Sequence, residues 1–566
     1  MSDRTTAPAA PSPGNTPAMT HRQVLEALSG IILGMFVALL AATITSTSMP
    51  RIVSDLGGSQ HAYTWVVTAT LLTQTVSTPL WGKFADLFNR KMLVQLALVI
   101  TVLSAAAAGL SQNMSMLIGF RAVQGVGAGG LMALATVLVA DIVSPRERGR
   151  YMGLIGGFMA ISQVGGPLLG GVITDSPLGW RWNFFVGVPF AIAAIVVLQK
   201  TLHLPPRPHR TVRIDYWGAV FISLGVALLL LWVTFAGDQF AWGSWQTAAM
   251  VGGAVASLVV AVLVERVVAE PIIPLHLFAN RTFVLAVIGS IAVGVAMFGT
   301  AVFLSQYLQL ARGKTPTESG LLTIPMVVGT MLAGIVFGRI ISRTGRYKAI
   351  MVGGAVVFIA ALVGMSTIDA HTSFVLISVY LFGLGLSVGA LMQNLVLATQ
   401  NTLHVSEMGS GTSAVAFFRS LGGAVGVSAL GAVLANTVKE DIASGLARLG
   451  VPADVMGGSA AVPDLSQVPA PVRTIIQDAY AHGIGEIFLI AVPMAVVALV
   501  CVIFLKEIPL GTRSGVEQLL EEQAAEERSK TAIAAGADTV GEELTAAAVA
   551  GDDGARAGGR DAAPRG

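Results

Sequence analysis

Apolar runs long enough to cross a lipid bilayer recur between residues 27 and 505, and they constrain the fold more than any other feature. A helix needs about 20 apolar residues to span the hydrocarbon core. We place fourteen such runs, at 27–49, 62–81, 92–111, 115–140, 150–173, 182–199, 216–236, 245–264, 281–308, 318–340, 347–367, 373–400, 408–436 and 483–505. The sequence therefore predicts an all-α membrane protein with fourteen transmembrane helices.

The composition excludes several other classes of protein. The 566 residues are 54% hydrophobic and only 12% charged, whereas soluble domains carry about 25% charged residues. A net charge of +2, without a basic patch interleaved with aromatic residues, argues against a nucleic-acid partner. Cys501 is the only cysteine and the eight histidines are scattered, so we expect no disulfide within the chain, no metal and no cofactor. The first apolar run lacks a small-x-small cleavage site, and we interpret it as a retained helix.

Basic residues gather in alternate loops and predict the orientation in the membrane. Under the positive-inside rule, loops rich in Lys and Arg are cytoplasmic. An even number of spans then puts both termini in the cytoplasm, in a multi-pass protein of the plasma (inner) membrane. The loop residues are Lys83, Arg90, Lys91, Arg146, Arg148, Arg150, Lys200, Arg207, Arg210, Arg213, Arg266, Arg281, Arg339, Arg343, Arg346 and Lys348.

An internal repeat divides the chain into two halves. "GKFADLFNRK" (82–91) follows the second run and "GRIISRTGRYK" (338–348), with Gly338 and Arg346, follows the tenth. Two parallel six-helix halves are a transporter architecture with a substrate path between them. The predicted parts are a disordered cytoplasmic tail (1–20), an N-terminal half (27–199), two inserted helices (216–264), a C-terminal half (281–505) with a polar external loop (437–482), and a mostly disordered cytoplasmic tail (511–566). The end of the external loop, "APVRTIIQDAYAHGIGEIF", is expected to extend the last helix.

On these loops the chain resembles the major facilitator superfamily, and in particular its fourteen-span drug:proton antiporter family of multidrug exporters. The resemblance covers nearly all of residues 27–510. The family's loop pattern falls on Gly82, Lys83, Asp86, Arg90 and Lys91. Asn89 stands where the family has a glycine, and we expect it to keep the tight turn by adopting a left-handed backbone.

Asp86 is a lone acid among basic residues and is a candidate gate latch. Its carboxylate can accept hydrogen bonds from a helix N-terminus, or from an arginine across the halves, in one conformation and release them in the other. The alternative is that the loop is only a cluster of topological charges.

Arg121 and Gln124, in "RAVQGVGAGG" of the fourth run, match a second family motif. A guanidinium inside a membrane helix needs a partner or a wet cavity. The resemblance implies a role in proton transfer, and the alternative is an arginine satisfied by backbone carbonyls.

Three further segments carry the resemblance. Gly165, Gly166, Pro167, Gly170 and Gly171 in "GGPLLGG" match the antiporter motif, which marks exporters, although small residues at such spacing also serve packing alone. In "WRWNFFVGVP", Trp180 and Trp182 suit an external aromatic belt. In "FFRSLGGAVGVS", Arg419 either pairs with a carbonyl or lines the cytoplasmic vestibule.

The first run lacks the acid that the family carries there, because that position falls on Ala41. Proton coupling needs a group that changes its protonation as the site alternates. No Asp or Glu lies deep in another run. The coupling candidates are therefore Asp86, with Arg121 relaying, and Glu486. Glu486 is alternatively an interfacial surface acid, and coupling is alternatively weak or absent.

Neutral polar and large apolar side chains remain as candidates for the substrate cavity. A cavity without an acid suits neutral or weakly charged amphipathic compounds better than dications. In a helix, each polar side chain can instead bond its own backbone, and each apolar one can serve packing. The candidates are Thr43, Thr45, Ser46, Gln74, Gln163, Phe303, Gln306, Met392, Gln393 and Asn394.

Together these features predict a monomeric secondary active exporter that works by alternating access. Its expected partners are the lipid bilayer, a small amphipathic molecule as substrate, and protons entering in exchange. A lipid or lipid-conjugate exporter with weak or absent proton coupling is the alternative. An enzyme is disfavoured because the spans hold no nucleophile–base pair or metal ligands, and a channel is disfavoured by the two-half repeat.

Overall fold

The structure is a computed structural model of the chain and divides into two units. One unit is Met1–Met19 with Gly515–Gly566, and the other is Thr20–Ser514. Of the first unit, the structure describes residues 517, 521, 524 and 525, which are helical, so most of the two predicted tails lies outside the described residues. In the second unit the described residues are 21–56, 60–144, 147, 151, 158, 161–162, 165–166, 169–170, 172–174, 176–202, 215–236, 239–268, 271–314, 316–404, 407–448 and 469–511.

Helices dominate the described part of the chain, which confirms the all-α prediction. The only bridge there joins Ala236 to Phe240. The helices are α1 (His21–Asp55), α2 (Gln60–Leu87), α3 (Arg90–Gly109), α4 (Met114–Ile142), η1 (Trp180–Phe184), α6 (Gly187–Thr201), α7 (Tyr216–Phe235), α8 (Trp245–Glu265), η2 (Leu275–Ala279), α9 (Arg281–Gln306), η3 (Tyr307–Ala311), α10 (Pro316–Leu322), α11 (Ile324–Thr344), α12 (Lys348–Ser366), α13 (Phe374–Gln400), α14 (Met408–Arg448) and α15 (Ala470–Phe504). The ten described residues between 151 and 173, in the predicted fifth span, are also helical.

Twelve helices of the described chain are long and apolar enough to cross a membrane. The predicted second span, α2, has 28 residues but is more polar than these twelve. The predicted fifth span is described only in part. The count of fourteen therefore stays a prediction that agrees with the observed helices.

Short polar side chains begin many of these helices. The first N–H groups of a helix lack intrahelical acceptors, and Asn, Asp and Ser oxygens satisfy them. Asn113 accepts from Met116 N at the start of α4, Ser244 from Thr247 N at the start of α8, and Asn280 from Thr282 N at the start of α9. The sequence thus sets the ends of the helices as well as their apolar interiors.

The predicted tenth span, 318–340, is broken into two helices. α10 ends at Leu322, and α11 begins at Ile324 with a proline in its first turn. Pro325 has no backbone N–H to continue the hydrogen bonds of the preceding helix. Its ring also disfavours helical backbone angles at the residue before it, Ile324. The single run in the sequence therefore folds as a short helix followed by the long α11.

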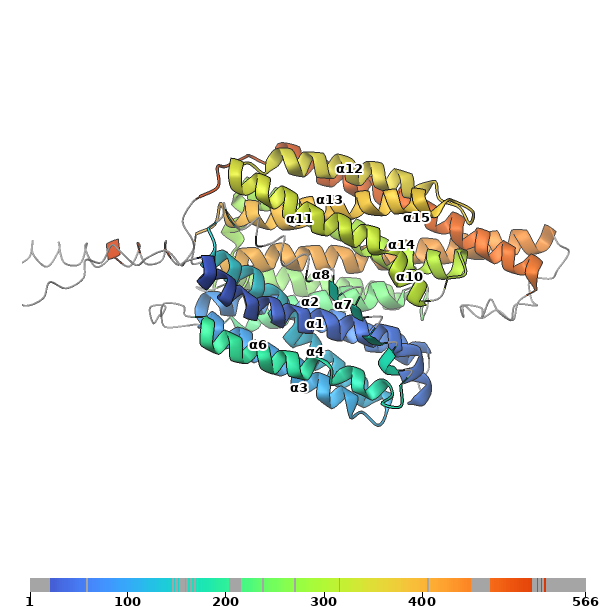
Figure 1. Ribbon diagram of the computed structural model, residues 1–566, viewed down its shortest axis with the longest axis horizontal. Coiled ribbons are helices and arrows are strands. Elements are labelled where there is room, and N and C mark those ends of the chain that lie inside the picture. Colours follow the sequence, from blue (N-terminus) through green and yellow to red (C-terminus); the bar gives the residue numbers. More distant parts are fainter. Residues whose placement is uncertain are drawn as a thin grey trace, which may run out of the picture. The chain divides into compact units, whose positions relative to one another are not determined.

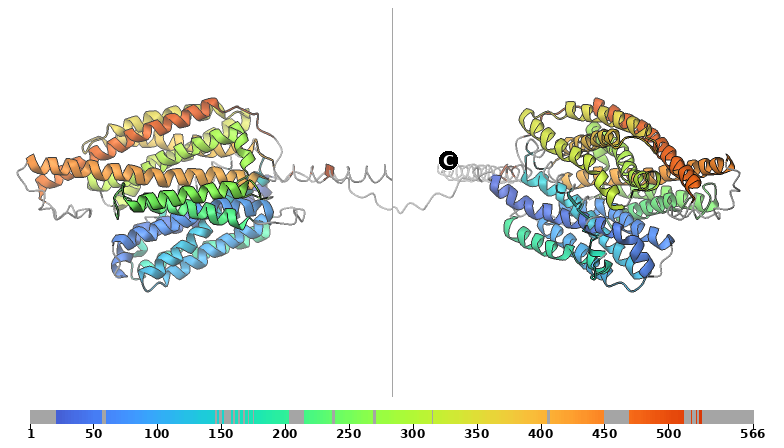
Figure 2. Two further views of the ribbon diagram at one scale, coloured as in Figure 1. Left: turned by 180° about the vertical axis from the view of Figure 1, so that it is seen from behind. Right: turned by 45° about the vertical axis from the view of Figure 1, so that its right-hand side comes forward.

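The last two helices are longer than a membrane requires. α14 has 41 residues and α15 has 35, so α14 is about 60 Å long. Of the predicted external loop 437–482, residues 437–448 and 470–482 are helical. Leu446 and Ile476 are buried there, so apolar packing continues beyond the predicted helix ends. Figures 1 and 2 show α14 and α15 extending together past the neighbouring helices.

The two halves meet where α2 packs against α14. α2 and α14 are neighbours, and both also contact the inserted helix α7. Within the halves, α2 packs on α4 and α14 packs on α9. In Figures 1 and 2 the helices α1–α6 and the helices α9–α15 form two groups with this seam between them. The chemistry described below lies at one end of that seam.

Candidate functional site

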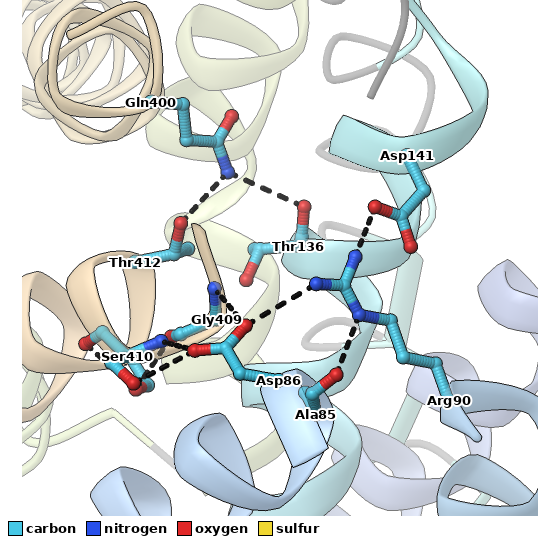
Figure 3. Close-up of polar contacts among 10 residues, drawn as sticks. Ala85, Asp86, Arg90, Thr136, Asp141, Gln400, Gly409, Ser410 and Thr412 are labelled. Atoms are coloured by element: carbon cyan, nitrogen blue, oxygen red, sulfur yellow. Dashed lines mark hydrogen bonds and ion pairs between the residues drawn. The ribbon is translucent and has the colours of Figure 1, made fainter. Parts of the chain in front are cut away.

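Five residues at one end of the seam form what we call the α2–α14 cluster: Asp86, Arg90, Asp141, Gly409 and Ser410 (Figure 3). Asp86 lies in the last turn of α2, and Arg90 is the first residue of α3. Asp141 lies in the last turn of α4, and Gly409 and Ser410 lie in the first turn of α14. The cluster thus joins three helix ends of the N-terminal half to one helix start of the C-terminal half.

Asp86 caps α14 across the seam. Its Oδ1 accepts a hydrogen bond from Gly409 N at 2.9 Å, and its Oδ2 accepts from Ser410 N and Ser410 Oγ, both at 2.7 Å. The first N–H groups of a helix lack internal partners and carry its positive dipole end, so a carboxylate is favoured there. The side chain of Asp86 is 4% exposed, and burial strengthens such charge-assisted bonds.

Two glycines allow α2 and α14 to approach this closely. A Cβ built on Gly82 would meet the Ser413 hydroxyl and lie 2.8 Å from Gly409 O. A Cβ built on Gly409 would lie 2.5 Å from Gly82 O and would also meet Asp86. Real Cβ atoms essentially never lie within 3.0 Å of another such atom, and a shift is costly where that atom belongs to the backbone, as Gly409 O and Gly82 O do. Gly82 is therefore needed for the approach of the two helices at this point.

Arg90 links Asp86 to a second acid. Its guanidinium lies 3.3 Å from Asp86 Oδ1 and forms an ion pair with Asp141, and its Nε donates to Ala85 O at 2.9 Å. Arg90 is 1% exposed, so its charge depends on these partners. The sequence left two partners open for Asp86, a helix N-terminus or an arginine across the halves. The partner across the halves is the N-terminus of α14, and the arginine in contact belongs to the same half as Asp86.

Gln400 makes a second bridge between the halves. From the last turn of α13, its Nε2 donates to Thr412 Oγ1 on α14 at 3.1 Å and to Thr136 O on α4 at 3.4 Å (Figure 3). Gln400 is 3% exposed. This end of the seam is therefore closed by hydrogen bonds from two helices of the C-terminal half.

Asn89 does not adopt the left-handed backbone that we expected. Its φ is −65°, and its side chain accepts from Lys91 N at 3.0 Å as the N-cap of α3. The expectation was wrong because Asn is also a preferred N-cap residue, and α3 begins directly after it. The glycine at the equivalent place in the C-terminal half, Gly345, does have a positive φ of 68°.

The repeated loop of the C-terminal half is anchored within its own half. Gly338 is buried in α11, and Arg346 is exposed in the turn that follows. Glu507 Oε1, after α15, accepts from Tyr347 N at 3.1 Å and from Lys348 N at 3.2 Å. In the N-terminal loop, Lys91 is bound likewise within its half, through Nζ to Gln199 O at 2.9 Å.

Arg121 lies away from the α2–α14 cluster. Its Nη1 donates to Gln124 Oε1 at 2.8 Å, and both residues are buried. Within the described chain its Nε has no hydrogen-bond partner. Arg121 and Asp141 are 20 residues apart on α4, which is about 30 Å. The structure thus does not bring Arg121 into contact with Asp86.

The glycine motif packs against α1. A Cβ on Gly166 would lie 2.6 Å from Thr43 Cβ, and a Cβ on Gly170 would lie 2.8 Å from Ile44 O. A Cβ on Gly165 would meet nothing within 4 Å. Pro167 and Gly171 lie outside the described residues. Close packing of α1 with this segment therefore depends on Gly166 and Gly170.

The hydroxyl groups of α1 serve the same packing. Thr43 Oγ1 donates to Leu39 O at 2.9 Å and reaches Ser162 O at 3.2 Å. Ser48 Oγ accepts from Asn183 Nδ2 at 2.6 Å, which joins α1 to η1. Thr43 and Ser48 in the polar stretch of the first span thus bind α1 to the segment around Ser162 and to η1.

Trp180 is buried rather than part of a surface aromatic belt. It is 5% exposed, and its Nε1 donates to Asp55 Oδ2 at 2.9 Å. The indole N–H needs an acceptor, and the carboxylate at the end of α1 supplies one. Trp182, with 51% exposure, lies at the surface as expected.

Four of the candidate cavity residues have bonding or packing that accounts for them. Thr45 Oγ1 donates to Ala41 O, and Asn394 Nδ2 donates to Ala390 O, both at 2.7 Å. Phe303 belongs to the buried core of the C-terminal half, and Met392 packs against that core.

Three amide side chains remain as candidates for a polar cavity wall. Gln74, Gln306 and Gln393 are half-buried, and none has a side-chain hydrogen bond to another described residue. Gln163 lies outside the described residues, as does the side chain of Ser46.

Glu486 and Arg419 lie in the last two helices. Glu486 Oε2 accepts from Thr437 Oγ1 at 2.8 Å between α15 and α14, and the residue is half-buried. Arg419 is half-buried on α14, where its backbone packs against Gly294 of α9. In the described chain no ion pair or hydrogen bond of its guanidinium is observed, so the expected pairing with a carbonyl is not seen there, and the position of Arg419 along a cytoplasmic vestibule stays a prediction.

Sequence reasoning did not single out Asp141, Gln400, Gly409, Ser410 or Thr412. The segment "EMGSGTS" opens α14 with glycine and hydroxyl residues, which is a recognisable signal for a helix start that approaches another chain segment.

The membrane-length helices, grouped on two sides of a hydrogen-bonded seam, are typical of a membrane transporter rather than an enzyme. The sequence profile of the Major Facilitator Superfamily matches residues 31–427. The chain therefore belongs to the major facilitator superfamily.

Two bacterial relatives cover most of the chain. An uncharacterized MFS-type transporter of Mycobacterium tuberculosis is 36% identical over 506 residues, covering 89% of this chain and 73% of that protein. The multidrug transporter protein MdtP of Bacillus subtilis is 31% identical over 524 residues, covering 88% of this chain and 96% of that protein.

A solved structure shares the fold. The human organic anion transporter MFSD10 superposes with a TM-score of 0.56 at 15% identity, covering 83% of this chain and 99% of that chain. At this identity the likeness is one of fold alone.

Proposed function

We propose that this protein exports amphipathic, hydrophobic compounds across the plasma membrane by alternating access, in exchange for protons. Both termini face the cytoplasm under the positive-inside rule, and the protein acts as a monomer. The names of relatives such as MdtP support drug efflux. The α2–α14 cluster then lies at the cytoplasmic end of the substrate path.

The capping of α14 by Asp86 carries this proposal. A carboxylate of one half that binds the helix N-terminus of the other half holds one end of the path shut. Releasing these bonds separates the halves at this end without breaking any backbone hydrogen bond within α2 or α14. The contact is therefore suited to the repeated opening and closing that alternating access requires.

Asp86 and Glu486 are the proposed proton-coupling groups. A proton on Asp86 would remove the charge that the α14 N-terminus and Arg90 stabilise, and so would favour opening. Glu486 lies toward the opposite end of α14 and α15, where its bond to Thr437 would weaken on protonation. The half-buried amides Gln74, Gln306 and Gln393 provide neutral groups for an uncharged or weakly charged substrate.

Substrate-driven proton flux in vesicles tests this function. The wild type is compared with Asp86→Asn and Glu486→Gln, with a fluorescent amphipathic dye as the substrate. We expect dye-dependent flux in the wild type and reduced flux in at least one variant. Unchanged proton flux in both variants would rule out Asp86 and Glu486 as the proton-coupling groups. Dye export without proton flux in the wild type would refute the antiporter and favour an exporter with weak or absent coupling.

A further inference from the structure

The inserted helices α7 and α8 share a hydrophobic cluster with both halves at the seam. Buried residues of α7, α8, η2, α9 and α14 belong to one contiguous cluster, and partly buried residues of α2 pack against it. Val226 of α7 and Val415 of α14 are among its members, and Leu80 of α2 packs on it. Of the inserted pair, α7 therefore contacts the same two helices that the α2–α14 cluster joins, and α8 packs on α7.

Three charged residues are buried at or near the ends of α2, α7 and α8. Lys83 follows Gly82 on α2 and is 8% exposed. Asp215 is the N-cap of α7 and is 5% exposed, and Glu265 is the last residue of α8 and is 6% exposed. The charges of Lys83 and Asp215 both act on Glu265. We call these three residues the brace cluster.

Glu265 also connects α8 to the C-terminal half. Its Oε1 accepts from Ile272 N at 3.1 Å, and its Oε2 accepts from Ile273 N at 3.2 Å. Ile272 and Ile273 lie just before η2, which leads into α9. A single carboxylate is thus bonded to the approach to one half and interacts through its charge with a lysine of the other half.

Asp215 gives this cluster a second, incompletely satisfied acid. Its Oδ1 accepts from Gly218 N at 2.7 Å, whereas its Oδ2 is buried with no hydrogen-bond partner among the described residues. Two buried carboxylates close to one ammonium group leave an excess negative charge that is costly away from water. Binding one proton removes that excess.

We propose that Glu265 is a proton-binding positioning residue, and that its ionised form braces the inserted helices against the loop 82–91. Protonation of Glu265 removes its attraction to Lys83 and weakens its bonds to Ile272 N and Ile273 N. The brace then loosens between α2 and the approach to α9. This inference rests on the proposed alternating-access cycle and assigns the inserted helices a part in it.

The pH dependence of a distance between α8 and the N-terminal half tests this inference. The full chain carrying Cys501→Ser, with spin labels at Leu263→Cys and Met92→Cys, is reconstituted in liposomes. Both labelled positions are exposed, with 55% exposure each. Double electron–electron resonance then gives the distribution of distances between the two spin labels at pH values from 5 to 8. We expect the distance distribution of the labelled parent chain to shift between pH 8 and pH 5. The labelled Glu265→Gln variant at pH 8 should give the distribution that the labelled parent chain gives at pH 5.

A matched control is available in the C-terminal half. Glu507 also accepts two backbone N–H groups through one carboxylate, but it lies outside the brace cluster. Glu507→Gln should therefore keep the pH-dependent shift. Asp215→Asn should move the midpoint of the shift to lower pH, because a repelling charge is lost. Lys83→Gln should move it to higher pH, because an attracting charge is lost.

The two proposals fail in distinguishable ways. A distance that stays fixed between pH 5 and pH 8, or Glu265→Gln following the same pH dependence as the parent chain, would overturn the brace. Dye export measured on the same liposomes tests the proposed function separately. Absent export with a pH-dependent distance would refute the exporter and leave the assignment of Glu265 standing as a proton-binding residue.

Discussion

Replacing Asp86 by asparagine is expected to release the N-terminus of α14 while changing the shape of the side chain very little. The carboxylate accepts three hydrogen bonds from Gly409 and Ser410. Asparagine keeps one acceptor oxygen. Its NH2 group replaces the other oxygen and cannot accept hydrogen bonds from the donors of Gly409 and Ser410. Arg90 keeps Asp141 as its partner, so the change acts mainly on the contact between the halves.

The expected cost follows from the number of bonds lost. A hydrogen bond to a charged group contributes about 1.5–3 kcal/mol, and the substitution removes the equivalent of one to two of the three. The closed form of this end should therefore lose about 2–4 kcal/mol of stability. Since 1.4 kcal/mol corresponds to a factor of ten, the end should open about 30 to 700 times more often.

Hydrogen–deuterium exchange of the first turn of α14 measures this change directly. The amides of Gly409 and Ser410 exchange when the contact opens, so their exchange rate should rise by about the same factor. Glu507→Gln serves as the control and should accelerate exchange at Tyr347 and Lys348 alone. Unchanged exchange at Gly409 and Ser410 in Asp86→Asn, alongside faster exchange in the control, would refute the reasoning.

Two glycine pairs give further predictions. Gly82→Ala should push α2 and α14 apart and reduce dye export at least tenfold, whereas Gly353→Ala, with open space around its Cβ, should leave export and the melting temperature unchanged. Gly166→Ala should clash with α1 and lower the melting temperature by several degrees, while Gly165→Ala should not. Equal effects of Gly165→Ala and Gly166→Ala would contradict the packing of this motif against α1.

The helices and their order could be predicted from the sequence because apolar runs of membrane length leave few alternatives. Gly82 and Asp86 could be singled out as well, Gly82 from the family's loop pattern and Asp86 as a lone acid among basic residues. The partner of Asp86 could not be predicted from the sequence. It lies 323 residues away in the chain, and no local pattern specifies which helix start it will cap.

Asn89 shows why a local substitution was misread. Both a left-handed turn and an N-cap favour asparagine, and the choice between them depends on where the next helix begins. Glu265 shows a different limit. At the end of an apolar run it looks like an ordinary interfacial acid, and only the folded structure reveals that it is buried and bonded to Ile272 N and Ile273 N.

The length of α14 has a mechanical consequence. This helix has no internal proline and runs from the residues capped by Asp86 to Arg448, beyond the other helices. If it pivots as a rigid rod of about 60 Å, a tilt of about 5° at the capped end displaces its far tip by about 5 Å. The far end of α14, together with the part of α15 packed on it, would therefore move whenever the capped end of α14 tilts. In the proposed orientation this tip faces the outside of the cell, so an antibody fragment that immobilised it there should arrest transport without touching the substrate path.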